Sequence, residues 1–214
     1  MSPGPTVRTF DERAADWDTP RRVARAEEAA ETIAAAIDIP PGCRAIEVGA
    51  GTGLLGLALR PRLGQLVLAD TSDGMLAEAD RKIREGRLDG VRTAHFDVAA
   101  DEPPPGGPFD LVVSLLLLHH VKDTRAALAG MHQLLAPGGQ VAAIDLDTED
   151  GSFHSPEAEG VHHHGFDRER LAELARAAGL TDVRVGDGHP IDDEGRRYPM
   201  FLLTARRRAS GAPQ

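Results

Sequence analysis

The segment IEVGAGTG, residues 46–53, constrains the fold of this 214-residue chain more than any other stretch. It begins like a buried strand and then places three glycines within five positions. Because glycine permits a positive φ and carries no Cβ atom, a ligand can approach such a backbone closely. The segment therefore predicts a strand followed by a turn that holds a small ligand. The alternative is a turn that binds nothing, since glycine turns also follow strands in proteins without a ligand.

The pattern of a strand followed by a helix repeats along the chain. Short apolar runs predict strands, and apolar residues at helical spacing between suitable cap residues predict helices. The predicted strands are 43–48, 65–70, 91–96, 109–116, 140–147, 181–187 and 198–206, and the predicted helices are 19–37, 54–60, one from about 72, 123–138 and 167–179. This alternation predicts the α/β class, with a parallel sheet covered on both faces.

The composition favours an ordinary globular domain and excludes several kinds of partner. Hydrophobic residues make up 41% and charged residues 27% of the chain, and its net charge of -10 repels nucleic acid. The most apolar run, residues 111–118, is too short to span a bilayer, and the N-terminus lacks a signal peptide pattern. The only cysteine, Cys43, excludes an intramolecular disulfide. We expect a cytoplasmic protein with no nucleic-acid or membrane partner, and the sequence predicts no oligomeric state.

The spacing of the glycines and the carboxylates around them indicate the kind of ligand. A dinucleotide-binding loop needs its third glycine where this chain has Leu54, which argues against an NAD-linked oxidoreductase. Glu47 suits a ligand with an ammonium or sulfonium charge better than a pyrophosphate. Asp70, at the end of the next predicted strand, can accept hydrogen bonds from ribose hydroxyls. Asp97 follows the third strand and can bind an exocyclic amine, while Met75 covers the other face of the base.

Five motifs in order resemble the class I S-adenosylmethionine-dependent methyltransferases, in particular the small-molecule type with a single methyltransferase domain. They are IEVGAGTG, LADTSDGML, HFDVA, FDLVVSLLLLHHV and LLAPGGQVAAIDL. The resemblance implies a Rossmann-like three-layer sandwich. Its seven-stranded sheet is mostly parallel, with the last strand antiparallel and inserted between 140–147 and 181–187.

The resemblance also implies a division of the chain and a set of cofactor contacts. Residues 1–214 form one domain, divided into an N-terminal helical lid (1–40), a cofactor-binding core (41–148), a substrate-side insertion loop (149–166) and a C-terminal helix with strands (167–214). The resemblance implies S-adenosyl-L-methionine as the cofactor. Its methionine part would be bordered by Glu47, Gly49, Gly51, Gly53 and the backbone of Ser114. Asp70 would border the ribose, and Asp97 the adenine. Trp17 is a predicted lid contact, or alternatively packs the first helix onto the sheet.

Methyl transfer from a sulfonium is an in-line displacement, so positioning and water exclusion can supply much of the acceleration. An acceptor hydroxyl or acidic carbon also needs a base, and histidine is the usual candidate. Of nine histidines, His119 and His154 are the predicted bases, because they follow the fourth and fifth strands at the expected mouth of the site. The alternative for each is a solvated loop or a helix-capping role.

Two further alternatives concern a metal and the absence of catalysis. The histidines, with Asp145, Asp147 and Glu149 nearby, are of the residue types that bind a divalent ion, but no tight ligand spacing supports this, and we predict no metal site. The function predicted is methyl transfer to a small organic acceptor. A sensor or partner subunit that binds S-adenosylmethionine or S-adenosylhomocysteine without turnover is the second hypothesis, because an intact glycine loop serves both.

Overall fold

The computed structural model of the chain describes residues 5–100, 104–155, 158–193 and 195–209. The elements, in chain order, are α1 (Pro5–Arg13), η1 (Ala14–Asp16), α2 (Pro20–Ala36), β1 (Arg44–Val48), α3 (Leu54–Leu59), η2 (Arg60–Arg62), β2 (Gln65–Asp70), α4 (Asp73–Gly86), β3 (Val91–His95), β4 (Phe109–Leu115), η3 (Leu118–His120), α5 (Thr124–Leu134), β5 (Leu135–Leu146), α6 (Arg168–Ala177), β6 (Thr181–Asp187), β7 (Ile191–Asp193), β8 (Arg196–Tyr198) and β9 (Met200–Arg206).

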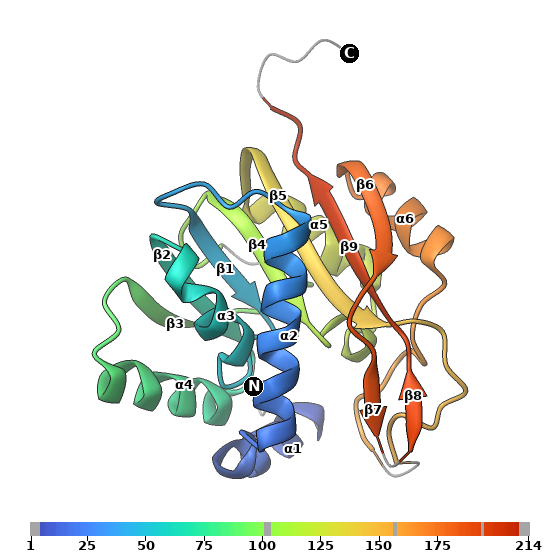
Figure 1. Cartoon of the computed structure of the whole chain (residues 1–214), viewed down its shortest axis with the longest axis horizontal. Coiled ribbons are helices and arrows are strands. Elements are labelled where there is room, and N and C mark those ends of the chain that lie inside the picture. Colours follow the sequence, from blue (N-terminus) through green and yellow to red (C-terminus); the bar gives the residue numbers. More distant parts are fainter. Residues whose placement is uncertain (1–4, 101–103, 156–157, 194, 210–214) are drawn as a thin grey trace.

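Seven of the strands form one twisted sheet in the order β3-β2-β1-β4-β5-β9-β6 (Figure 1). The pairings among β1 to β5 are parallel, whereas β9 pairs antiparallel with both β5 and β6. The last strand of the chain is thus inserted between its two predecessors in the sheet. The α/β class, the seven-stranded mostly parallel sheet and the position of the antiparallel strand are all confirmed.

Helices cover both faces of the sheet, as the long apolar strands require (Figure 1). One apolar core packs α5 and α6 against the sheet, and the other packs α2, α3 and α4 against the opposite face. Successive residues of β1 point alternately into the two cores: Ile46 and Val48 into the first, Ala45 into the second. Glu47 is the one buried charged residue of β1, and it lies near the glycine turn.

Side-chain caps fix where the helices begin, as the cap residues predict. Thr19, Ser72, Asp123 and Asp167 each accept a hydrogen bond from the backbone three residues on, at α2, α4, α5 and α6. Because α4 and α5 closely follow β2 and β4, the caps Ser72 and Asp123 also help to fix the segments at the carboxyl ends of these two strands.

Two boundaries differ from the sequence-based prediction. α5 ends at Leu134 rather than near residue 138, and β5 begins at Leu135 and runs through Pro137 and Gly138. Leu135 pairs with Phe109, and the register shifts before Leu111 pairs with Gln140, so that β5 accommodates the extra residues and pairing overrides the turn signal of proline and glycine. The tail also forms a short hairpin, β7–β8, that was not predicted. In the described residues no helix is long and apolar enough to cross a membrane.

Candidate functional site

A cavity of about 1440 Å³ lies at the carboxyl ends of β1 to β4. Its floor includes the glycine turn after β1, and residues of α1 and α2 line the side away from the sheet. Nine of the eleven predicted site residues line it: Trp17, Glu47, Gly49, Gly51, Asp70, Met75, Asp97, His119 and His154. The location follows from the fold, because ligands of open α/β sheets bind beyond the carboxyl ends of the strands.

The three glycines of the turn all have positive φ, of 65°, 53° and 81° for Gly49, Gly51 and Gly53, but their surroundings differ. A Cβ atom at Gly49 would lie 2.5 Å from Leu117 Cδ1, and one at Gly53 would lie 2.6 Å from Leu68 Cδ1. At Gly51 the nearest atoms would be Met75 Sδ at 3.8 Å and Trp17 Nε1 at 3.9 Å. Gly51 therefore opens toward the cavity, whereas its two neighbours serve close packing within the protein.

Asp70 connects the glycine turn to the start of α4. Its Oδ2 accepts a hydrogen bond from Gly51 N at 2.6 Å, and its Oδ1 accepts one from Ser72 N at 2.9 Å. Burial raises the pKa of Asp70, and hydrogen bonds from Ser72, Gly51 and Thr71 oppose that rise. Since a carboxylate oxygen has two acceptor sites, each Oδ retains capacity for a ligand hydroxyl. Asp70 thus shapes the turn and lies in the cavity wall at the same time.

Glu47 is 2% exposed, and its Oε2 accepts a hydrogen bond from Gly56 N at 2.8 Å. Burial raises the pKa of Glu47 to about 8. The hydrogen bond from Gly56 lowers this pKa but does not cancel the effect of burial. The side chain is therefore mostly protonated at neutral pH in the free protein. A bound cation would favour the carboxylate, so the charge of Glu47 depends on the ligand.

Around the predicted adenine position, Met75, Phe96 and Val98 are all buried and contribute apolar surface to the cavity. Asp97 lies between the last two on the exposed side, and its Oδ1 accepts a hydrogen bond from Ala99 N at 2.8 Å. The structure thus brings together the carboxylate and the apolar surfaces that an adenine ring needs.

Two predicted residues lie outside the cavity wall. Gly53 is at the N-terminus of α3 and packs on Leu68, as described above. Ser114 is 1% exposed and lies within β4, where it pairs with Ala143. The wall is formed one to three residues later, by Leu115, Leu116 and Leu117. Leu116 has a φ of 55°, and this left-handed turn carries the chain away from the sheet after β4.

The N-terminal segment is held against the glycine turn and α4 by contacts that the sequence pattern does not reveal. Asp18 Oδ1 accepts a hydrogen bond from Thr52 Oγ1 at 2.5 Å, and the same carboxylate pairs with Lys82. Asp11 Oδ1 accepts hydrogen bonds from Ser72 Oγ at 2.6 Å and from Gly74 N at 2.8 Å. Both contacts join residues more than thirty positions apart, so they depend on the tertiary structure.

Trp17 has features of both roles considered for it, a lid contact at the cavity and packing of the N-terminal part of the chain. Its ring stacks edge-on against Phe10 at 5.6 Å between centroids, and the Arg22 guanidinium lies 4.0 Å from its centroid. The half-buried ring also lines the cavity close to Gly51. Trp17 therefore both packs the N-terminal segment and forms part of the wall.

Arginines from α1 and α2 give this side of the cavity a positive charge. Arg13, Arg21, Arg22 and Arg25 all line it. Burial lowers the pKa of Arg25, and the neighbouring Arg22 and Arg21 lower it further. Arg21 pairs with Asp193 at 2.7 Å, whereas Arg25 has no hydrogen-bond or ion-pair partner within the described ranges. A half-buried guanidinium without a partner is a suitable site for an anionic group.

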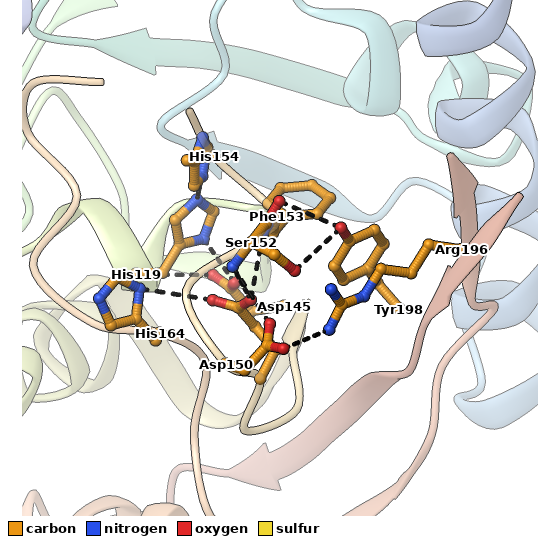
Figure 2. Close-up of polar contacts among 10 residues, drawn as sticks. His119, Asp145, Asp150, Ser152, Phe153, His154, His164, Arg196 and Tyr198 are labelled. Carbon is orange, nitrogen blue, oxygen red and sulfur yellow. Dashed lines mark hydrogen bonds and ion pairs between the residues drawn. The ribbon is translucent and has the colours of Figure 1, made fainter. Parts of the chain in front are cut away.

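The predicted bases His119 and His154 lie in direct contact at the opposite wall. His154 Nε2 is 3.0 Å from His119 Nε2, and His119 Nδ1 is 2.6 Å from Asp145 Oδ1 (Figure 2). Figure 2 shows the three side chains in a row, from the loop after β5 through η3 to β5. His119 and Asp145 are fully buried, and His154 is half-buried.

The electrostatics of this row favour a neutral His154. Burial lowers the pKa of His154 to about 4, and the neighbouring His119 contributes to the decrease. Burial by itself would raise the pKa of Asp145, but His119 and hydrogen bonds hold it below the usual value. Asp145 is therefore an anion that fixes the orientation of His119. The sequence signalled Asp145 only as one of several nearby acids.

The remaining histidines of the loop face other partners. The side chain of His163 contacts Val121 O at 3.0 Å and Thr124 Oγ1 at 3.2 Å, which attaches the loop to the start of α5. His162 is exposed, and the His164 Nδ1 lies 3.4 Å from Glu149 Oε1. His120, next to His119, lines the cavity and was not singled out from the sequence.

Residues 46–141 match a family model described as a methyltransferase domain. An uncharacterized methyltransferase of Schizosaccharomyces pombe is 29% identical over 67% of this chain and 55% of its own length. A ubiquinone/menaquinone biosynthesis C-methyltransferase of Teredinibacter turnerae is 35% identical over 54% of this chain and 47% of its own length. The chain thus spans about half the length of these curated relatives.

A solved structure supports the same fold over nearly the whole chain. A SAM-dependent methyltransferase from Aquifex aeolicus superposes with a TM-score of 0.68 and 17% identity, over 92% of this chain and 97% of its own. Together with the matching domain model, this likeness makes residues 46–141 similar to a methyltransferase domain and the fold of the chain similar to that of a SAM-dependent methyltransferase.

Proposed function

We propose that this protein binds S-adenosyl-L-methionine and transfers its methyl group to a small organic acceptor. The observation that carries the proposal is Asp70, whose two oxygens hold Gly51 and Ser72 while facing the cavity. This carboxylate holds the one glycine of the turn that opens toward the ligand. Glu47 adds a buried carboxyl group that suits a cationic cofactor.

The size of the cavity supports a second molecule beside the cofactor. At about 1440 Å³ it exceeds the roughly 300–1,000 Å³ of an ordinary small-molecule site. A nucleoside cofactor over β1 to β3 leaves space toward β4 and β5. There the wall can align the acceptor with the methyl group, which is a main requirement of an in-line displacement.

We propose that His119 and His154 activate the acceptor. His154 is neutral, half-buried and faces the cavity, and His119 holds it in place with Asp145 behind. A neutral imidazole positioned in this way accepts a proton from a hydroxyl or an acidic carbon.

The arginines of the facing wall support an acceptor with a negative charge. Four guanidinium groups in a protein of net charge -10 are concentrated on this wall, and among the described residues Arg25 makes no hydrogen bond or ion pair, although Asp193 and Glu28 raise its pKa. A carboxylate or phosphate on the acceptor would supply the partner. A screen of small acids beside their neutral amides tests this choice, with Arg25→Ala as the variant that abolishes any preference.

Calorimetric titration with S-adenosylmethionine and S-adenosylhomocysteine tests the proposal, with NADH as control ligand. We expect both to bind and Asp70→Ala to remove the binding. Slow conversion to S-adenosylhomocysteine on incubation supports an enzyme, whereas binding without any conversion supports a sensor. Binding of NADH in place of both ligands would overturn the assignment of the glycine turn.

A further inference from the structure

Three histidines converge at the acceptor wall of the cavity. His119 and His120 come from η3, and His154 comes from the loop after β5, more than thirty residues along the chain. One ring nitrogen from each lies within 4.8 Å of the other two. Tetrahedral Zn²⁺ with bonds of about 2.05 Å places its ligand nitrogens about 3.3 Å apart, so small side-chain movements would bring all three onto one ion.

In two of these rings, Nδ1 is occupied by a hydrogen bond to another part of the protein, which leaves Nε2 for a common ligand. His119 Nδ1 is hydrogen-bonded to the Asp145 carboxylate at 2.6 Å, and His120 Nδ1 to Gly160 O at 2.9 Å. Histidines that bind metals almost always donate the other ring N–H to a carboxylate or a backbone carbonyl. In both rings this leaves Nε2 unprotonated and available as a ligand.

A hydrogen-bond network alone does not satisfy this cluster. Because Nδ1 of His119 donates to Asp145, its Nε2 accepts the proton of His154 Nε2, which lies 3.0 Å away. His120 Nε2 then has no hydrogen-bond partner within the described ranges. An ion bound to Nε2 of all three rings would satisfy both ring nitrogens of His119 and His120, and the buried anion Asp145 compensates part of its charge.

We propose that His119, His120 and His154 bind a single divalent transition-metal ion, such as Zn²⁺, at the acceptor end of the cavity. Three neutral imidazoles select Zn²⁺, Co²⁺ or Fe²⁺ over Mg²⁺ and Ca²⁺, which prefer oxygen ligands. All three residues line the cavity, so the remaining coordination position faces the acceptor. Three protein ligands with one open position are typical of catalytic rather than structural sites.

The role of such an ion rests on the proposed methyltransferase function. A bound ion lowers the pKa of an oxygen acceptor and orients it toward the methyl group. The acceptor oxygen would then be activated by direct coordination to the ion, in place of transfer of its proton to His154. In both mechanisms this wall of the cavity activates the acceptor. They differ in whether a proton or a metal ion lies between the Nε2 atoms of the histidines.

The test uses the full chain, expressed without a histidine tag, stripped with a chelator and titrated with Co²⁺. We expect one ion per chain and the intense visible absorption of four-coordinate cobalt, which Zn²⁺ then displaces. His154→Ala should weaken Co²⁺ binding at least about a hundredfold, because it removes one of three ligands, and Asp145→Asn should weaken it about 10- to 100-fold. His162→Ala, an exposed histidine of the same loop, should leave binding unchanged.

Binding of S-adenosylhomocysteine to each variant checks that it is folded and tests the proposed function separately. Co²⁺ binding that depends on His154 supports the metal site even if no nucleoside cofactor binds. If the wild-type protein shows no cobalt absorption, or if His154→Ala binds Co²⁺ as tightly as the wild type, the metal site is overturned. Binding lost equally in His162→Ala would overturn it as well, since the ion would then belong to the exposed loop.

Discussion

The cavity has two sides that are built in different ways. On the cofactor side, the glycine turn, Asp70 and Asp97 each follow directly on a strand of the parallel sheet, and backbone N–H groups fill much of the carboxylates' hydrogen-bonding capacity. On the acceptor side, side chains from η3, β5 and a long loop contact each other. The first side is thus part of the sheet, whereas the second depends on where loops pack. We therefore expect changes on the cofactor side to affect both folding and cofactor binding, and changes on the acceptor side to affect neither.

The largest effect is expected from Asp70→Ala. The change removes acceptors for Gly51 N and Ser72 N and any contact with ribose hydroxyls, which together correspond to about 3 kcal/mol of cofactor binding, or roughly a hundredfold in affinity. Calorimetric titration with S-adenosylhomocysteine measures it. Asp89→Ala, at an exposed aspartate, is the control and should bind normally. Unchanged affinity in Asp70→Ala would show that this carboxylate is only structural.

The glycines of the turn should separate stability from binding. Gly53→Ala combines a φ of 81° with a Cβ 2.6 Å from Leu68 Cδ1, so we expect it to lower the free energy of unfolding by about 2–4 kcal/mol. Gly51→Ala meets no close atom and should lower it by only about 1–2 kcal/mol, the cost of the left-handed backbone.

Cofactor affinity should respond differently to these two substitutions. The Cβ of Gly51→Ala projects into the cavity, so we expect affinity to fall at least about tenfold in the folded protein. Urea unfolding and calorimetric titration measure the two quantities separately. Equal losses of stability and affinity in both variants would contradict the distinction drawn between the glycines.

Glu47 predicts a pH dependence of cofactor binding. Its pKa of about 8 in the free protein means that the side chain is protonated at pH 7, and a cationic cofactor favours the deprotonated form. Binding should therefore release nearly one proton per chain at pH 7, and affinity should rise with pH up to about 8 and then level off.

Titrations in two buffers of different ionisation enthalpy measure this release. Glu47→Gln cannot lose a proton and is the matched control, so its affinity should be flat over the same pH range. Proton uptake on binding, or release that persists in Glu47→Gln, would assign the effect to another group.

The smallest effect on cofactor binding is expected from His154→Ala. The side chain is half-buried in a loop, and its ring and hydrogen-bond contacts with the described residues are to the histidine cluster and Phe153. Affinity for S-adenosylhomocysteine should therefore stay within about twofold, and the free energy of unfolding within about 1 kcal/mol. Calorimetry and urea unfolding check both values. A loss of cofactor affinity as large as that of Asp70→Ala would contradict the independence of the two sides.

The same difference explains which site residues could be predicted. Gly51, Asp70 and Asp97 follow strands, so their positions at one edge of the sheet were predictable as soon as the strands were. Ser114 lies one residue before the wall, which begins at Leu115, and the left-handed turn at Leu116 has no glycine to signal it. The contacts of Asp18 with Thr52 and Lys82 could not be predicted, since three separate segments meet there.

The sequence by itself determined the α/β alternation, the helix caps, the glycine turn and the cofactor side of the cavity. Each depends on local rules: the period of apolar residues, the preference of cap residues and the freedom of glycine at positive φ. Only the tertiary structure decided that His154 meets His119 and His120, and that Asp145 rather than a neighbouring acid is the buried partner. The physical reason is that β4, β5 and the loop beyond them are joined through packing across the sheet, which no local pattern of residues specifies.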